Sequence, residues 1–298
     1  MSTLEKSVPL EYDGIKLRHY LKEGFELSSR FIKRVAVENR ALVNGEAAMM
    51  NLRVKTGDKV TVLLDREEKQ DIVPEKMDLD IVYEDDDILV VNKKPFMVVH
   101  PTKSHQSGTL ANGVINYFRE CGKNHIVRLV SRLDMNTSGL IVIAKSQYAH
   151  MTLQRSEMEK RYIAIVHGHL KEKEGTIDLP IYRPQPEDGF DSIKRVVDDR
   201  GQRSITHYKV LESFNDGDVV ECLLETGRTH QIRVHLSHLG HPIYGDFIYG
   251  DGDNELHLIK RQALHAYGLN FISPRSGKEL SLRADLPYDF KELIEKLK

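Results

Sequence analysis

The sequence predicts an α+β protein with a mixed, mostly antiparallel sheet, preceded by a smaller helical domain. Its 298 residues are enough for about two domains. Strand-like runs dominate after residue 80, and they do not alternate with helices in the βαβ rhythm of a parallel sheet. A polar, charged segment over residues 67–80 contains Pro74 and separates two strand-like runs, so we place the domain boundary near residue 72.

Two short helices and two strands are predicted before this boundary, over residues 17–25, 28–40, 41–46 and 51–64. Ser28 or Ser29 can cap the second helix, because a serine hydroxyl accepts a backbone N–H there. The same helix carries Arg30, Lys33 and Arg34. On charge alone these three side chains describe a solvated helix face, although two helices and a hairpin also suit a small module that docks on RNA.

Strands outnumber helices in the rest of the chain. They are expected over residues 88–95, 139–146, 161–170, 204–214, 218–227 and 269–274. Helices are expected over residues 107–121, 146–157 and 230–239, with one more at the C-terminal end.

The net charge of −2 is an average over unlike segments. Residues 67–87 carry a net charge of −8, whereas residues 11–66 and 88–298 each carry +3. The acidic connector therefore masks the positive net charge of the two flanking segments. Their charge permits a nucleic acid as partner without requiring one.

Composition excludes several classes of protein. Apolar stretches fall far short of the ~18 residues that a membrane helix needs, and the start of the chain shows no apolar signal segment. Two cysteines, Cys121 and Cys222, cannot form a disulfide framework or a four-cysteine zinc site. We therefore expect a cytoplasmic protein that does not contact membranes.

The first stretch with chemical potential is SRLDMNTSGLIVIAKS, residues 131–146. Arg132 and Asp134 precede a polar turn that leads into an apolar strand, and a carboxylate in such a loop is held firmly while it stays accessible. A nucleophile or general base needs both properties. The alternative is that Asp134 caps the turn with its own side chain, which spacing alone favours.

The second stretch is ETGRTHQIRVHLSHLGHPIYGD, residues 225–246. Gly227, before a predicted helix start, offers backbone N–H groups suited to an anion. The polar residues that follow are Arg228, Thr229, His230, Gln231 and Arg233. The histidines of this stretch, His230, His235, His238 and His241, also raise a metal site as an alternative. No cysteine or carboxylate completes a ligand set, so hydrogen-bonded histidines are the favoured interpretation.

The third stretch is KRYIAIVHG, residues 160–168. Tyr162 opens an apolar strand and is either a core residue or a ring on which a base stacks. In the second case, its neighbours Lys160 and Arg161 meet phosphates.

Taken in order, these stretches resemble the RluA/RluD-type pseudouridine synthases. The resemblance covers nearly all of residues 80–290, including NKKPFMVVHPT at residues 92–102, and the pair RLDxxTSGL and GRTHQIRVH is its most specific part. Residues 1–72 resemble the αL RNA-binding domain of small-subunit ribosomal proteins, which leaves residues 73–298 as the catalytic domain. The family usually has His where this chain has Ser131.

The resemblance implies an isomerase that converts uridine to pseudouridine within RNA, with no metal, nucleotide or redox cofactor. By motif, Asp134 is the catalytic carboxylate, Arg233 pairs with it, Arg132 fills the space left by a flipped uridine, and Tyr162 stacks on the base. Tyr162 is also a candidate to accept the final proton from carbon 5. We assign substrate contacts to Lys160, Arg228, Thr229, His230 and Gln231, and RNA contacts to Arg30, Lys33 and Arg34.

Three other functions remain as alternatives. An RNA-binding protein without catalysis fits the N-terminal module and the two positively charged segments, but it does not need Asp134 and Arg233. A glycosidase would pair Asp134 with Glu225. A histidine-bound metal enzyme is the third. For the synthase, we expect ribosomal RNA before transfer RNA as substrate, and a monomer without an obligate protein partner.

Overall fold

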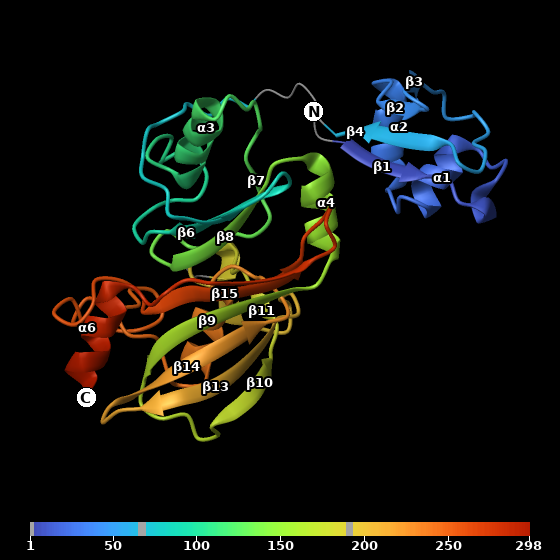
Figure 1. The fold of residues 1–298 in the computed structure, drawn as a ribbon. Coiled ribbons are helices and arrows are strands. Elements are labelled where there is room, and N and C mark those ends of the chain that lie inside the picture. The colour runs from blue at the N-terminus through green and yellow to red at the C-terminus, as the bar shows by residue number, and fades with distance from the viewer. Residues whose placement is uncertain (1–2, 65–69, 189–192) are drawn as a thin grey trace. The chain divides into compact units, whose positions relative to one another are not determined.

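A computed structural model describes residues 3–64, 70–188 and 193–298 of the chain. Contacts between Cα atoms divide it into a small N-terminal unit and a larger unit, with the boundary between residues 69 and 70 (Figure 1). Ile72, at the predicted boundary, is buried in the core of the larger unit.

The N-terminal unit consists of two helices and a small antiparallel sheet. Its two α-helices are α1 (Leu17–Glu23) and α2 (Ser29–Val37), and a 3-10 turn, η1 (Leu10–Tyr12), precedes them. Its strands are β1 (Thr3–Ser7), β2 (Ala41–Val43), β3 (Glu46–Ala47) and β4 (Lys59–Leu63), in the order β1-β4-β2-β3. The core contains Leu17, Leu21, Phe31, Val35 and Val60.

Local sequence explains where α2 begins and how β2 turns into β3. Ser28 is the N-cap of α2, and its hydroxyl accepts the N–H of Phe31 at 3.1 Å. Asn44 and Gly45 join β2 to β3 with φ angles of 53° and 88°, the pair of left-handed residues that a tight hairpin turn requires.

Strands dominate the larger unit. They are β5 (Ile81–Glu84), β6 (Ile88–Lys93), β7 (Arg128–Leu129), β8 (Ser138–Ala144), β9 (Met158–His167), β10 (Glu174–Asp178), β11 (Ile181–Tyr182), β12 (Val196–Val197), β13 (Ile205–Ser213), β14 (Gly217–Leu224), β15 (Leu264–Ile272) and β16 (Glu279–Arg283). All but β11 and β12 join one sheet in the described residues, in the order β10-β13-β14-β9-β15-β8-β6-β5, with β16 beside β15 and β7 beside β8. Neighbouring strands are antiparallel except β8 and β15, which confirms the predicted mixed, mostly antiparallel sheet.

Four α-helices of the larger unit lie where the sequence predicts them. They are α3 (Leu110–Glu120), α4 (Gln147–Arg155), α5 (Gln231–His238) and α6 (Tyr288–Leu297), with a 3-10 turn, η2, at Pro186–Asp188. The helix predicted from residue 107 starts later, because Gly108 has a φ of 67° and Thr109 is the N-cap, in a capping box with Asn112. Within the described ranges, no helix has the length and apolar character to span a membrane.

The centre of the sheet is buried on both faces, which explains its continuous apolar runs. Along β8, Ile141 and Ile143 face one hydrophobic cluster, and Leu140 and Val142 face another. Gly139 has a φ of 116°, and a Cβ there would collide with the backbone of Ala266 on β15. Only glycine therefore lets β8 and β15 pair at the point where the chain leaves the loop before β8.

Candidate active site

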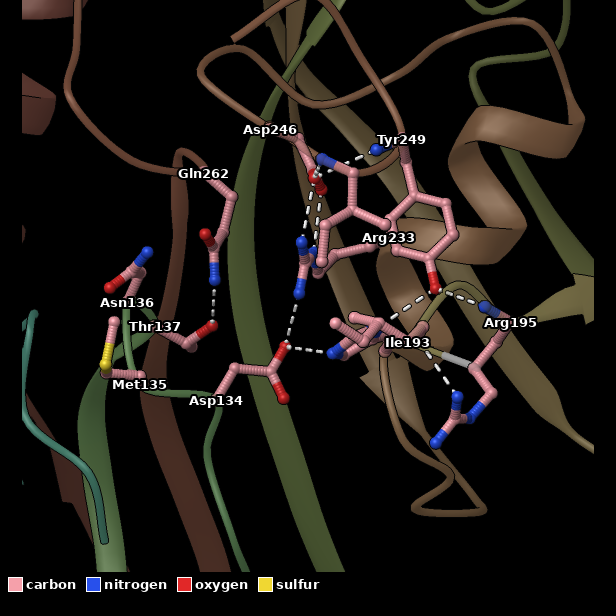
Figure 2. A network of polar contacts seen from close by, with 12 residues as sticks. Asp134, Met135, Asn136, Thr137, Ile193, Arg195, Arg233, Asp246, Tyr249 and Gln262 are labelled. Carbon is pink, nitrogen blue, oxygen red and sulfur yellow. Dashed lines mark hydrogen bonds and ion pairs between the residues drawn. The ribbon is translucent and has the colours of Figure 1, made fainter. Parts of the chain in front are cut away.

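Asp134 and Arg233 meet at the end of the central strands. Asp134 lies in the loop between β7 and β8, and Arg233 projects from α5. Arg233 Nη1 donates to Asp134 Oδ2 at 2.8 Å, as Figure 2 shows. The Arg233 side chain is 5% exposed and that of Asp134 is 28% exposed, so the carboxylate is the accessible member of the pair.

A second carboxylate, Asp246, fixes the other edge of the same guanidinium. Arg233 Nε and Nη2 donate to Asp246 at 2.7 and 2.8 Å, and the N–H groups of Ile248 and Tyr249 donate to it as well (Figure 2). Burial acts to raise the pKa of Asp246, but the hydrogen bonds and charge of Arg233, with these N–H groups, bring it below its ordinary value. Burial likewise opposes the charge of Arg233, but Asp246 and Asp134 raise its pKa, which keeps it charged.

The Asp134 side chain does not cap its turn. The turn closes through the backbone, where Thr137 N–H donates to the Asp134 carbonyl at 3.1 Å. The carboxylate is directed to Arg233 instead. The turn-capping interpretation of Asp134 is therefore wrong.

Buried polar groups from distant segments hold the residues that follow Asp134. Arg261 Nη1 donates to the Asn136 carbonyl at 3.1 Å, and Gln262 Nε2 donates to Thr137 Oγ1 at 3.1 Å. His265 Nδ1 lies 2.9 Å from Ser138 Oγ. Figure 2 shows the Gln262 contact beside Asp134. Each anchor fixes the loop from a different residue, so the carboxylate has little freedom to move.

Lys93 supports the same loop from β6. Its ammonium donates to the carbonyls of Lys94, Met97 and Met135 at 2.9 to 3.0 Å. Burial, followed by the charge of Arg261, lowers the pKa of Lys93 to about 7. Among the described residues, the hydrogen-bond partners of this nitrogen are all carbonyls, and one of them belongs to residue 135, directly after Asp134.

The carboxylate faces an open pocket with about 360 Å3 of empty space, solvent at its mouth included. It is lined by Arg132, Leu133, Asp134, Thr137, Tyr162, Leu224, Arg228, His230, Gln231, Ile232, Arg233 and Leu264. Tyr162 comes from β9 and is buried, and burial together with the charge of Asp134 raises the pKa of its hydroxyl. Tyr162 is therefore a neutral phenol near neutral pH, suited to presenting its ring to an apolar or aromatic surface.

The other residues assigned to the substrate take different places. Arg132 and Arg228 are exposed and line the cavity. Gln231 also lines it, but its amide is engaged with Ile205, Thr206, Thr226 and the backbone of residue 228. Thr229 is exposed and Lys160 half-buried, and neither lines this cavity.

His230 links the cavity to Tyr249. It is the N-cap of α5 and has a φ of 60°, a left-handed conformation that is uncommon for a residue with a side chain. Its Nδ1 lies 2.9 Å from Tyr249 Oη, and its Nε2 lies 3.7 Å from Asp134 Oδ2. Burial lowers the pKa of His230, which favours the neutral ring.

Three histidines of the second stretch, His230, His235 and His241, have protein partners. His235 lies 2.9 Å from Thr206 Oγ1, and His241 lies 2.9 Å from the carbonyl of residue 167. Among the described residues, no three His, Cys, Asp or Glu side chains are placed to hold a metal ion. Glu225, the second carboxylate of the glycosidase alternative, bonds to His207 at 2.7 Å and does not line the cavity.

Sequence reasoning missed four groups that shape the site: Asp246, Tyr249, Lys93 and Arg261. Asp246 ends the second stretch, 13 residues after Arg233, and an unassigned Asp in that stretch was the available signal. Nothing in the sequence distinguishes Lys93 and Arg261 from exposed cations, because their roles come from burial.

Comparisons with known proteins agree with this site. A model of the RNA pseudouridylate synthase family matches residues 87–238, which include Asp134, Tyr162 and Arg233. The uncharacterized RNA pseudouridine synthase YlyB of Bacillus subtilis (strain 168) is 44% identical over 268 residues, which cover 88% of this chain and 86% of that protein. The ribosomal large subunit pseudouridine synthase D of Escherichia coli (strain K12) is 37% identical over 299 residues, covering 95% and 90% of the two chains.

A solved structure shows the same fold. The human RNA pseudouridylate synthase domain containing 4 superposes with a TM-score of 0.58 at 28% identity, covering 73% of this chain and 92% of that one. The family model matches half of the chain, and both relatives align along most of their length. Because the paired carboxylate at the cavity agrees with these matches, the chain belongs to the RNA pseudouridylate synthase family and is an RNA pseudouridine synthase.

Proposed function

We propose that the protein isomerises uridines of ribosomal RNA to pseudouridine, with Asp134 as the catalytic carboxylate. The observation that carries this proposal is the ion pair between Asp134 and Arg233 at the wall of the cavity. Arg233 donates to the carboxylate, and the lining ring of Tyr162 offers a surface on which the uracil can stack.

The chemistry needs one ionised oxygen beside the ribose. Cleavage of the glycosidic bond develops positive charge on the sugar and negative charge on the uracil. A carboxylate can attack the anomeric carbon, stabilise an oxocarbenium-like state, or remove the 2′ proton, and all three routes use Asp134 in the same place. The released uracil then turns and carbon 5 bonds to the same sugar carbon, displacing the carboxylate if it had bonded there. Carbon 5 loses its proton and the freed N1 gains one, so the product is an isomer of uridine.

The cavity also has to receive and keep the base. A uridine within a helix must leave its stack, which costs a few kcal/mol. Arg132 is exposed at the cavity and has no ion pair within the described part of the chain, so it is free to occupy the space that the uridine leaves. Tyr162, Leu224 and Leu264 supply apolar lining against which the detached uracil can stay while it turns.

Two observations favour ribosomal RNA. The Escherichia coli relative is named for the ribosomal large subunit, and it aligns with 95% of this chain. The N-terminal unit has two helices and a hairpin, which supports the resemblance to an αL-type module, and Arg30, Lys33 and Arg34 lie within two turns of α2. None of the three has an acidic partner among the described residues, which leaves their charges for phosphates.

The test is to map pseudouridines in ribosomal and transfer RNA from strains with and without the gene. We expect one or more ribosomal pseudouridines to disappear, and purified protein to restore them in RNA from the deletion strain without a change in RNA mass. An Asp134→Asn variant is the matched control and should restore none. Loss of transfer RNA sites alone would refute the ribosomal assignment, and release of free uracil would indicate a hydrolase.

A further inference from the structure

The two oxygens of the Asp134 carboxylate have different surroundings. Oδ2 accepts from Arg233 Nη1 at 2.8 Å and lies 3.7 Å from His230 Nε2. Within residues 3–64, 70–188 and 193–298, Oδ1 has no hydrogen bond or ion pair, and Figure 2 shows it directed away from Arg233. One oxygen is thus held by the protein and the other is open.

The contacts of Tyr249 indicate which ring nitrogen of His230 carries the proton. Tyr249 Oη accepts the backbone N–H of Arg195 at 2.8 Å and lies 2.9 Å from His230 Nδ1. If the imidazole donated to this oxygen as well, the phenol proton would have no acceptor among the described residues. The phenol therefore donates to Nδ1, and the remaining ring proton is on Nε2, which faces Asp134.

The charges around His230 are consistent with a neutral ring. Burial is the main cause of its lowered pKa, and Arg233 and Arg195 act in the same direction, whereas Asp134 and Asp246 oppose them. A neutral imidazole with its proton on Nε2 supplies one N–H, and it adds no charge that would compete with Arg233 for Asp134.

We propose that His230 is a positioning residue that holds Asp134 Oδ2 together with Arg233, so that Oδ1 is the oxygen presented to the ribose. This inference rests on the proposed role of Asp134. The distance of 3.7 Å exceeds that of a hydrogen bond, and such contacts commonly tighten when substrate fills the site. The left-handed backbone of His230 is the local strain that accompanies this placement.

Two substitutions of His230 by amide residues test the two ring nitrogens separately. His230→Asn places an amide near the Nδ1 position, keeps the contact to Tyr249 and tolerates the left-handed backbone, but it loses the donor to Asp134. His230→Gln places an amide nitrogen near the Nε2 position and keeps that donor. Ribosomal RNA from the deletion strain is the substrate, with enzyme in excess, so that the rate constant of a single turnover is measured apart from RNA affinity.

We expect His230→Asn to lower the single-turnover rate constant about tenfold to a hundredfold, the worth of a hydrogen bond to a charged group. RNA affinity and melting temperature should stay close to those of the wild type, and His230→Gln should recover most of the rate. A wild-type rate for His230→Asn would overturn the proposal. So would a His230→Gln variant that is as slow as His230→Asn or slower, because the Tyr249 contact alone would then explain the histidine.

Two further variants complete the test. Tyr249→Phe removes the phenol that fixes the imidazole, and we expect a rate between those of the wild type and His230→Asn; an unchanged rate would contradict the assigned ring proton. Asp134→Asn tests the proposed function itself. If this variant converts RNA as fast as the wild type, the proposed role of Asp134 is wrong. If Asp134→Asn is inactive while His230→Asn is fully active, only the positioning role fails.

Discussion

Two aspartates share Arg233, and they differ in almost every other respect. Asp246 has no exposed side-chain surface, two bonds to the guanidinium and two to backbone N–H groups. Asp134 is 28% exposed, takes one bond from the guanidinium and faces the cavity. One ion pair of Arg233 is therefore buried in the protein, and the other opens onto the cavity, although the same cation serves both.

The buried pair of Arg233 with Asp246 supports the accessible pair of Arg233 with Asp134. A buried arginine without a partner is costly, and Asp246 removes that cost before any substrate arrives. The guanidinium is then fixed in orientation, so its remaining N–H meets Asp134 without rearrangement during the reaction. Changing each aspartate separately should therefore affect different properties.

The largest expected effect is on the rate of the Asp134→Asn variant. We expect the single-turnover rate constant to fall at least about a thousandfold, as when an essential reacting group is removed. Because the side chain is partly exposed and makes one bond, the free energy of unfolding should change by no more than about 1 kcal/mol. Pseudouridine formation and urea denaturation measure the two quantities, and substantial turnover would remove Asp134 from the mechanism.

The second effect is on the stability of the Asp246→Asn variant. Loss of this charge leaves Arg233 buried with one partner, so we expect the free energy of unfolding to fall by about 3–5 kcal/mol. Asp178→Asn, which breaks an exposed pair with Arg203, is the control and should cost less than about 1 kcal/mol. Equal stability of the two variants in denaturant would contradict a structural role for Asp246.

The smallest expected effect is on how stability depends on pH, because His265 and Asp246 should lose their contributions in different pH ranges. Burial lowers the pKa of His265 to about 4 from an ordinary 6.5, so the unfolded chain binds this proton first. The free energy of unfolding should fall as pH decreases from about 6.5 to about 4, by about 3 kcal/mol for this group. Asp246, whose pKa is lowered, loses its contribution only at lower pH, below about 4.

A His265→Asn variant provides the control for this pH window. Its amide can keep the contact to Ser138 Oγ, but it cannot titrate. We expect the unfolding free energy of this variant to depend less on pH between 6.5 and 4 than that of the wild type, and the same at more acid pH. Identical profiles in denaturation experiments across that range would show that His265 does not titrate as its burial implies.

Sequence patterns predicted those elements whose side chains make the element stable. β8 and β9 are apolar over most of their length, and α2 shows its cap and its apolar spacing. β1 was not predicted, because TLEKS lacks apolar alternation and is a strand only through its pairing with β4. Such strands depend on a neighbour that is distant in sequence, and a local pattern does not contain it.

The same limit applies to the site. Motifs pointed to Asp134 and Arg233, which the fold brings together across 99 positions of sequence. Asp246 and Lys93 were missed because charged residues are ordinarily exposed, and only the structure shows that these two are buried. Their functions follow from surroundings rather than residue type.

The anchors of the Asp134 loop determine when the site can form during synthesis. Arg261, Gln262 and His265 contact residues 136–138, which are made 125 to 127 residues earlier. Asp134, Tyr162 and Arg233 are thus translated before these three anchors of the loop. A nascent chain that ends before Arg261 carries Asp134, Tyr162 and Arg233 without these three anchors, so we expect it to be inactive until residues 261–265 have folded against the loop.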